Sequence, residues 1–291
     1  MPELIRLKPD PTPAIHPVPE YAADASLSQV YERTKRGLGV PWMGVVAMAL
    51  AHYRNFYDCL WQAMEPTVAT KAFADACKEL RIVAEQEAAS LRPAAIRPKL
   101  TTLGYDDREI EEIKNCNEIF SSGNMPYVLM ASLARLLLEG QAWEGNGPAQ
   151  PHNASGLKTV KPVLIETHHA DPVIAEIYAD IRQTLDLPFV NTDYRAFARW
   201  PSYFDHAWTD LRSMVPTEEY QLAVRHVHNR AVALVDRLPN MSRITPQQLI
   251  SCAERDAKLS EVLSVVRLFQ WLLPGLAVNV AVLKHQLSKV E

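Results

Sequence analysis

Apolar residues recur at spacings of three and four along most of this chain, which is the spacing of one face of an α-helix. Segment 70–89 begins at Thr70, a side chain that can cap a helix, and segment 106–120 begins with acidic residues that suit a helix N-terminus. The same spacing predicts further helices over residues 172–184, 202–214, 217–237, 245–256 and 259–285, the last of them broken near Pro274. The pattern therefore predicts an all-α fold.

Part of this pattern occurs twice, because residues 23–70 recur without a gap 147 positions further along the chain. Identical residues occupy both copies in the pairs Tyr31 and Tyr178, Leu38 and Leu185, Pro41 and Pro188, Ala49 and Ala196, Asp58 and Asp205, Trp61 and Trp208, and Thr70 and Thr217. Conservative pairs such as Phe56 with Tyr203 extend the agreement to the apolar pattern. We therefore predict two homologous helical repeats that pack with pseudo-two-fold symmetry, with the active site at their interface.

Proline and glycine divide the chain into segments. Residues 1–22 are rich in proline and lack the apolar run of a signal peptide, so we expect an extended N-terminal arm. Residues 139–162 hold four of the ten glycines and three prolines, which is typical of a linker. This linker would join a first repeat, 23–138, to a second repeat, 163–291, within one compact body.

Charge and composition argue against several kinds of partner. The formal net charge is −4 and Lys and Arg form no clustered stripe, whereas nucleic-acid binding depends on concentrated positive charge. The apolar tract 262–283 is interrupted by Arg267, Gln270 and Pro274, which are costly inside a bilayer, so we expect buried core helices. Four cysteines without CxxC spacing are typical of a reducing compartment, so we expect a cytoplasmic protein.

One position of the repeat changes from an apolar to an ionisable residue, since Val46 in the first copy corresponds to Asp193 in the second. The neighbours of this aspartate are strongly apolar: Phe189, Val190, Tyr194 and Phe197. A carboxylate that loses water has a raised pKa and can act as a general base towards a water molecule. Alternatively, Asn191, Thr192 and Asp193 are all good N-cap residues, and the aspartate could simply satisfy backbone amides at a helix start.

Asn117 is a second polar residue in an apolar setting. It follows Ile113 by four positions and precedes Phe120 by three, so its amide is expected on the apolar side of its helix. A buried amide must find hydrogen-bond partners. It could bond to a neighbouring helix, or it could hold a water molecule or a substrate group near Asp193.

The histidines offer weak evidence for a metal site. His168 and His169 are adjacent and therefore point apart on a helix, and His226 and His228 are two residues apart rather than four. The chain also contains no GxGxxG, phosphate-loop or GxSxG motif, so nucleotide and serine-hydrolase chemistry have no support in the sequence. A helical metalloprotein that uses the His168 region is nevertheless an alternative.

The VPWMGV segment around Trp42, the NTDY segment around Asp193 and the two helical halves together resemble the group I 2-haloacid dehalogenases. In that all-helical family an aspartate of the second repeat activates a water that attacks C2 of the haloacid, and halide leaves with inversion and without an ester intermediate. The resemblance gives this role to Asp193. It gives the asparagine that helps to place the water to Asn117, with Asn124 as the alternative.

The resemblance also implies the residues that contact the substrate, which are Trp42, Val46, Asn191, Thr192, Phe269 and Leu276. Asparagine at position 191 is similar to the D-specific branch of the family, in which its bulk crowds the L-substrate. We therefore expect hydrolysis of short D-2-haloalkanoic acids to L-2-hydroxy acids by a cytoplasmic homodimer, without metal or organic cofactor. The alternatives are a dehalogenase that accepts both enantiomers and a non-catalytic helical-repeat interaction protein in which Asp193 is a helix cap.

Overall fold

The computed structural model describes residues 4–152 and 160–288. The predicted all-α fold is confirmed over this part of the chain, in which the only β pairing is an isolated bridge between Thr70 and Pro151. Residues 153–159 of the predicted linker, 1–3 of the predicted arm and 289–291 of the predicted second repeat lie outside the described residues.

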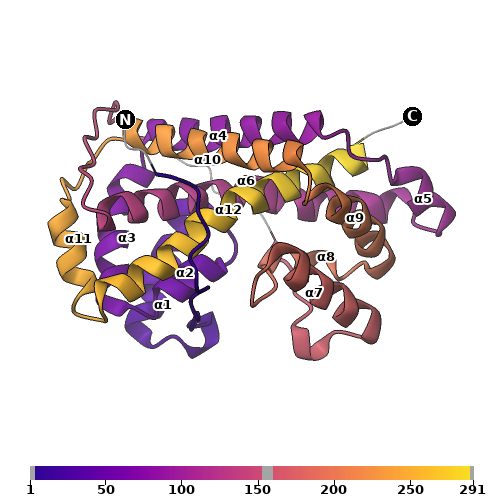
Figure 1. Cartoon of the computed structure of the whole chain (residues 1–291), viewed down its shortest axis with the longest axis horizontal. Helices are drawn as coiled ribbons and strands as arrows, with labels where there is room; N and C mark the ends of the chain where they lie inside the picture. Colours follow the sequence, from indigo (N-terminus) through magenta and orange to yellow (C-terminus); the bar gives the residue numbers. More distant parts are fainter. Residues whose placement is uncertain (1–3, 153–159, 289–291) are drawn as a thin grey trace.

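Two series of helices follow one another along the chain (Figure 1). The first series consists of η1 (Glu20–Ala22), α1 (Ala25–Leu38), α2 (Val45–Leu50), α3 (Arg54–Val68), α4 (Lys71–Ser90), α5 (Arg97–Thr102) and α6 (Asp107–Leu138). The second consists of η2 (Thr167–His169), α7 (Pro172–Leu185), α8 (Thr192–Phe197), α9 (Pro201–Met214), α10 (Glu218–Arg237), α11 (Pro246–Ala253) and α12 (Leu259–Ser288).

Several helices of the two series begin and end 147 residues apart, as α1 and α7, α2 and α8, and α4 and α10 do. Their caps correspond as well. Asp24 and Asp171 each accept a hydrogen bond from a backbone N–H of the first turn, and so do Thr70 and Thr217. The local signals that start these helices are therefore duplicated together with the apolar pattern.

The two longest helices, α6 and α12, form the centre of the molecule and pack against each other, with α4 and α10 beside them (Figure 1). The predicted break near Pro274 is wrong, because α12 continues through that residue. Pro126 likewise lies inside α6. Proline removes one helix hydrogen bond, but both prolines are buried in segments whose neighbours are nearly all buried too, so tertiary packing offsets the loss.

The length and apolar composition of α12 would suffice to cross a membrane, and it is the only such helix among the described residues. In the folded chain, 89% of its most apolar window is buried by other helices. This apolar surface therefore serves the core, as the sequence predicts for the tract 262–283.

The N-terminal segment is extended and is fastened to the helices by several hydrogen bonds. The carbonyl of Leu4 accepts from His228 Nε2 on α10 at 2.6 Å, and the carbonyl of Ile5 accepts from Arg135 Nη1 on α6 at 2.8 Å. Gln270 on α12 bonds to both His228 and Arg135. Because His228 donates through Nε2, its Nδ1 accepts from Gln270, and this buried network fixes the start of the arm.

Candidate active site

Asp193 is the second residue of the short helix α8 and is buried, with 2% of its surface exposed. Asn124 on α6 donates a hydrogen bond from Nδ2 to its Oδ1 at 2.6 Å. The N-cap position of α8 belongs to Asn191. The alternative role of Asp193 as a helix cap is supported only in part. Its carboxylate bonds to its own backbone N–H, but the residue lies inside the helix and not at the N-cap position. Capping alone requires no such burial.

Burial is the largest influence on this carboxyl group, and it raises the pKa of Asp193 to about 6. The hydrogen bond from Asn124, the backbone N–H and the positive charge of Arg195 act in the opposite direction, but they do not cancel the effect of burial. A carboxylate with a pKa near 6 is mostly ionised at neutral pH and is a stronger base than an exposed one. That combination suits a general base.

Asn117, expected to hold a water molecule or a substrate group near Asp193, forms no hydrogen bond to that carboxylate among the described residues. The Asn117 Nδ2 donates instead to the carbonyl of Val280 on α12 at 3.0 Å, which is the helix-to-helix bond considered as its alternative role. Its Oδ1 is buried without a hydrogen-bond partner among the described residues. Asn117 and Asn124 lie on one helix seven residues apart, or about 10 Å along its axis, and of the two only Asn124 hydrogen-bonds to α8.

Trp42 lies against the same part of α6. Its ring stands edge-on to Phe120 with the centroids 4.9 Å apart. A Cβ atom at Gly123 would lie 2.3 Å from the indole, so only glycine at this position lets the tryptophan approach the helix next to Asn124. Tyr127 donates a hydrogen bond to the carbonyl of Trp42 at 3.2 Å, which holds this residue in place.

The other apolar residues expected around the substrate are all buried. Val46 occupies the second position of α2, as Asp193 does in α8, and is 3% exposed. Phe269 and Leu276 come from α12 and are equally enclosed. The Phe269 ring lies 6.1 Å from that of Phe189, which precedes α8. Their burial gives them the dry, apolar character expected of a wall around an apolar substrate group.

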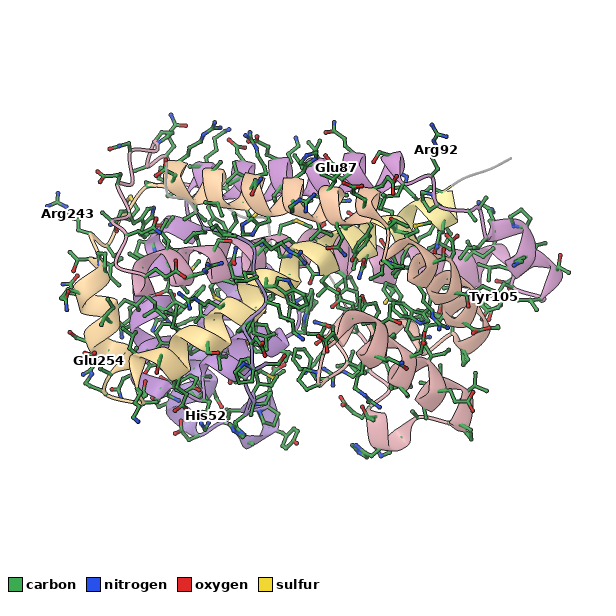
Figure 2. All side chains as sticks on the ribbon, in the orientation of Figure 1. His52, Glu87, Arg92, Tyr105, Arg243 and Glu254 are labelled. Atoms are coloured by element: carbon green, nitrogen blue, oxygen red, sulfur yellow. The ribbon has the colours of Figure 1, made fainter. Side chains whose placement is uncertain are left out.

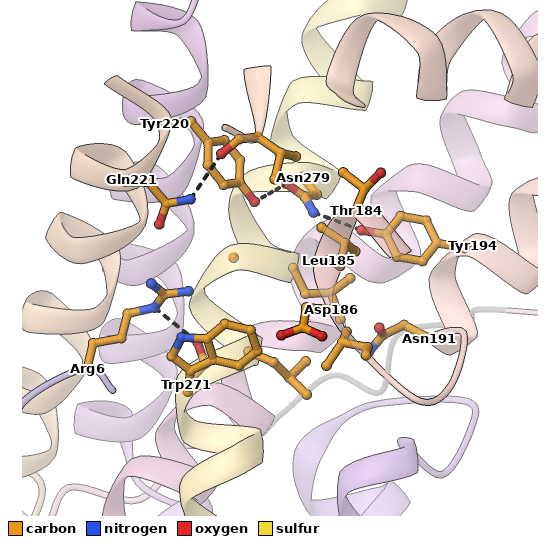
Figure 3. A pocket seen from close by; sticks show the side chains of 15 residues that line it. Arg6, Thr184, Leu185, Asp186, Asn191, Tyr194, Tyr220, Gln221, Trp271 and Asn279 are labelled. Carbon is orange, nitrogen blue, oxygen red and sulfur yellow. Dashed lines mark hydrogen bonds between the residues drawn. The ribbon is translucent and has the colours of Figure 1, made fainter. Parts of the chain in front are cut away.

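Two hollows flank the first turn of α8. Asn191, Tyr194 and Leu276 contribute to a cavity of about 200 Å³ (Figure 3). Trp42, Phe189, Thr192 and Arg195 contribute to a larger recess of about 680 Å³. The carboxylate of Asp193 lines neither hollow, because its side chain faces Asn124 on α6. Of the predicted binding residues, Asn191 and Leu276 thus line one hollow and Trp42 and Thr192 the other, whereas Val46 and Phe269 line neither of these two.

Arg195 lines the larger recess, and its positive charge also acts on the carboxylate of Asp193. Its Nη2 donates to Thr192 Oγ1 at 3.2 Å, and its Nη1 forms a 2.6 Å ion pair with Glu166. Sequence reasoning did not identify this arginine, nor did it identify Asn279, which bonds to Tyr194 beside the smaller cavity. The sequence did contain one signal that could have identified Asn279, because it is a polar residue within the apolar tract 262–283.

Among the described residues, no three His, Cys, Asp or Glu side chains are grouped so that they could hold a metal ion. His168 and His169 are exposed, with ring centroids 4.1 Å apart.

A desolvated carboxylate held against an amide inside a helical body is a group that could act as a general base. Comparisons with known proteins specify this class further. No protein-family model matches the chain. Over 251 residues it is 44% identical to an (R)-2-haloacid dehalogenase of Rhizobium sp. (strain NHG3), a match that covers 83% of this chain and 95% of that protein. It is 38% identical over 281 residues to an (R)-2-haloacid dehalogenase of Pseudomonas putida, covering 94% and 93%.

The fold agrees with these relatives. The structure of a D-2-haloacid dehalogenase in complex with L-LA matches with a TM-score of 0.90 and 35% identity, over 97% of this chain and 100% of the other. This chain therefore belongs to the family of all-helical 2-haloacid dehalogenases, hydrolases that act on carbon–halide bonds, and within it to the D-specific branch.

The raised pKa of Asp193 predicts a cost in stability. Between the ordinary pKa of 3.8 and about 6, the folded chain holds a proton that the unfolded chain releases, so stability falls as pH rises through this range. The full cost, present above pH 6, is on the order of 3 kcal/mol. We expect Asp193→Asn to unfold at a higher urea concentration than the wild type at pH 8, with a smaller difference at pH 5. An equal difference at both pH values would contradict the burial of an ionised carboxylate.

Proposed function

We propose that this chain hydrolyses short D-2-haloalkanoic acids to L-2-hydroxy acids, for example D-2-chloropropionate to L-lactate. The carrying observation is the buried carboxylate of Asp193 against Asn124, in a chain 44% identical to an (R)-2-haloacid dehalogenase. A water molecule next to Asp193 gives its proton to the carboxylate while its oxygen attacks C2. The carbon–halogen bond breaks on the opposite side, so the configuration inverts and halide leaves.

Three features of the described residues support this role for the acid. Asn124 holds one carboxylate oxygen and so fixes the direction in which the other can meet water. The pKa near 6 leaves most of the group ionised at neutral pH, ready to accept a proton. Trp42, Val46, Phe269 and Leu276 are buried, and around the substrate they would keep bulk water from the reacting carbon and offer an apolar surface to the halogen and alkyl group.

The arrangement of the chain fits the same proposal. Asn124 belongs to the first repeat, 23–138, and Asp193 to the second, 163–291, so the site would lie at the interface between the repeats. We propose that the repeats pack with pseudo-two-fold symmetry in one compact body, with residues 139–162 as the linker between them. A homodimer in the cytoplasm remains our prediction.

Enantiomer preference tests the function itself. Asn191 is buried at the start of α8 and lines the smaller cavity, where its side chain would crowd an L-substrate. We expect the wild-type protein to release halide from D-2-chloropropionate at least 100-fold faster than from the L-enantiomer, with L-lactate as the product. Comparable rates would support the alternative that accepts both enantiomers. Absence of halide release from either one would overturn the proposed function and favour a non-catalytic interaction protein.

The two asparagines of α6 provide a matched pair of variants. Asn124→Ala removes the hydrogen bond to Asp193, so we expect kcat for D-2-chloropropionate to fall by about 100-fold or more, as for loss of a positioned polar group. Asn117→Ala removes a buried bond to Val280 on the same helix and should reduce stability by about 1 kcal/mol while kcat changes less than threefold. Steady-state halide assays on both variants show which asparagine supports catalysis. A larger loss of kcat in Asn117→Ala would return the positioning role to that residue.

A further inference from the structure

The smaller cavity contains a cation without a counterion. Arg6 reaches it from the N-terminal arm, donates from Nε to the carbonyl of Trp271 at 3.0 Å and lies 5.2 Å from the centroid of the same indole (Figure 3). Among the described residues it forms no ion pair, whereas most arginines of this chain do. A largely buried guanidinium that no carboxylate neutralises is a place where an anion binds favourably.

The free donors of Arg6 lie beside the open space. A Cβ atom built at Gly275 would be 3.9 Å from Arg6 Nη2 and 3.5 Å from the Tyr220 hydroxyl, so these two groups border the gap that the glycine leaves. Within the described residues, Nε is the only nitrogen of the Arg6 guanidinium that donates a hydrogen bond. Burial, together with the nearby charge of Arg225, lowers the pKa of Arg6 to about 10, as expected for a cation that lacks a counter-charge.

A second donor comes from Tyr194, the residue after Asp193. The Tyr220 hydroxyl donates to Asn279 Oδ1 at 2.7 Å, and Asn279 Nδ2 donates to the Tyr194 hydroxyl at 2.8 Å (Figure 3). The Tyr194 hydroxyl thus accepts a hydrogen bond, and the proton of this hydroxyl has no acceptor among the described residues. Because each bond in this series donates towards Tyr194, the Tyr194 hydroxyl can donate its proton to a ligand in the cavity.

One carboxylate also lines the cavity, and its charge would oppose an anion. Asp186 is paired with Lys8 Nζ, which additionally donates to the Asp186 backbone carbonyl at 2.8 Å. The Asp186 side chain is 83% exposed, so water screens what remains of its charge. Lys8 therefore neutralises the only acid at the rim and leaves Arg6 as the uncompensated charge.

We propose that this cavity is an anion-binding antechamber to Asp193, in which Arg6 and the Tyr194 hydroxyl hold the carboxylate of the incoming 2-haloacid. The arm that carries Arg6 is anchored through Leu4 to the buried His228, so the guanidinium is held in place before substrate arrives. The cavity of about 200 Å³ accommodates an acid of two to four carbons, and Asn191 on its wall leads to α8. This inference rests on the proposed function.

Steady-state halide release from D-2-chloropropionate tests the antechamber with three variants. Arg6→Gln should raise KM by about 10- to 100-fold, the loss expected for one charge-assisted hydrogen bond, with kcat within threefold of the wild type. Arg6→Lys keeps the charge but loses the planar fork, so its KM should be intermediate. Arg243→Gln removes an exposed cation at the edge of the molecule (Figure 2) that does not line the cavity, and it should leave both constants unchanged. A KM for Arg6→Gln within twofold of the wild type, or a loss confined to kcat, would overturn the proposal.

Gly275→Ala provides a test that does not disturb the arm. The added methyl group enters the gap between Tyr220 and Arg6 without a contact shorter than 3.5 Å, and alanine favours a helix over glycine by about 1 kcal/mol. Stability should therefore rise or stay constant while KM increases several-fold. If Arg6→Gln does not fold, an unchanged KM in Gly275→Ala and Arg6→Lys overturns the proposal.

Calorimetric titration of Asp193→Asn separates this inference from the proposed function, because it requires no turnover. We expect L-lactate to bind, and Arg6→Gln in the same background to weaken that binding at least tenfold. Binding of bromide but not of L-lactate would assign the cavity to the halide product and refute the carboxylate assignment. Equal L-lactate affinity with and without Arg6→Gln would refute the anion site. A wild type that releases no halide, together with Arg6-dependent L-lactate binding, would refute the proposed function alone.

Discussion

Desolvation of the Asp193 carboxylate is the interaction on which the site depends. One short hydrogen bond from Asn124 partly compensates the loss of water, and the remaining cost appears as a pKa of about 6. Were the group exposed, its basicity would be that of an ordinary aspartate and bulk water would compete for the substrate carbon. Glycine at position 123 matters because it lets the ring of Trp42 pack closely against α6, next in sequence to Asn124.

Such a site needs a scaffold that tolerates its cost. The long helices α6 and α12 are buried along most of their length and pack on each other, and their prolines do not interrupt them. Asn124 lies in the middle of α6, so its position is set by this packing rather than by a mobile loop. The duplicated caps and helices supply a similar framework twice, while only the second copy carries the acid at the position of Val46.

The apolar pattern was sufficient to predict α4, the first half of α6 and most helices of the second series, and the repeat identified Asp193 by its contrast with Val46. The same pattern ended the helix of Asn117 at residue 120, whereas α6 continues to Leu138 and also carries Asn124. Periodicity defines a face of a helix, but it does not decide which residue of that face bonds to a neighbouring helix. The pattern also predicted a break at Pro274, since local propensity carries no information about burial on all sides. Arg6 was not predictable for a related reason, as its partner Trp271 lies 265 residues away in the chain.

Water attack directed by Asp193 is tested most directly by a single turnover in heavy-oxygen water, with protein in excess over D-2-chloropropionate. If Asp193 acts as a base, the label appears in the lactate formed in that first turnover, and the aspartate, analysed by mass spectrometry, stays unlabelled. Label incorporated into Asp193, with unlabelled oxygen in the lactate, would mean that the carboxylate attacks C2 itself and forms an ester. That result would contradict the role of Asp193 as a base.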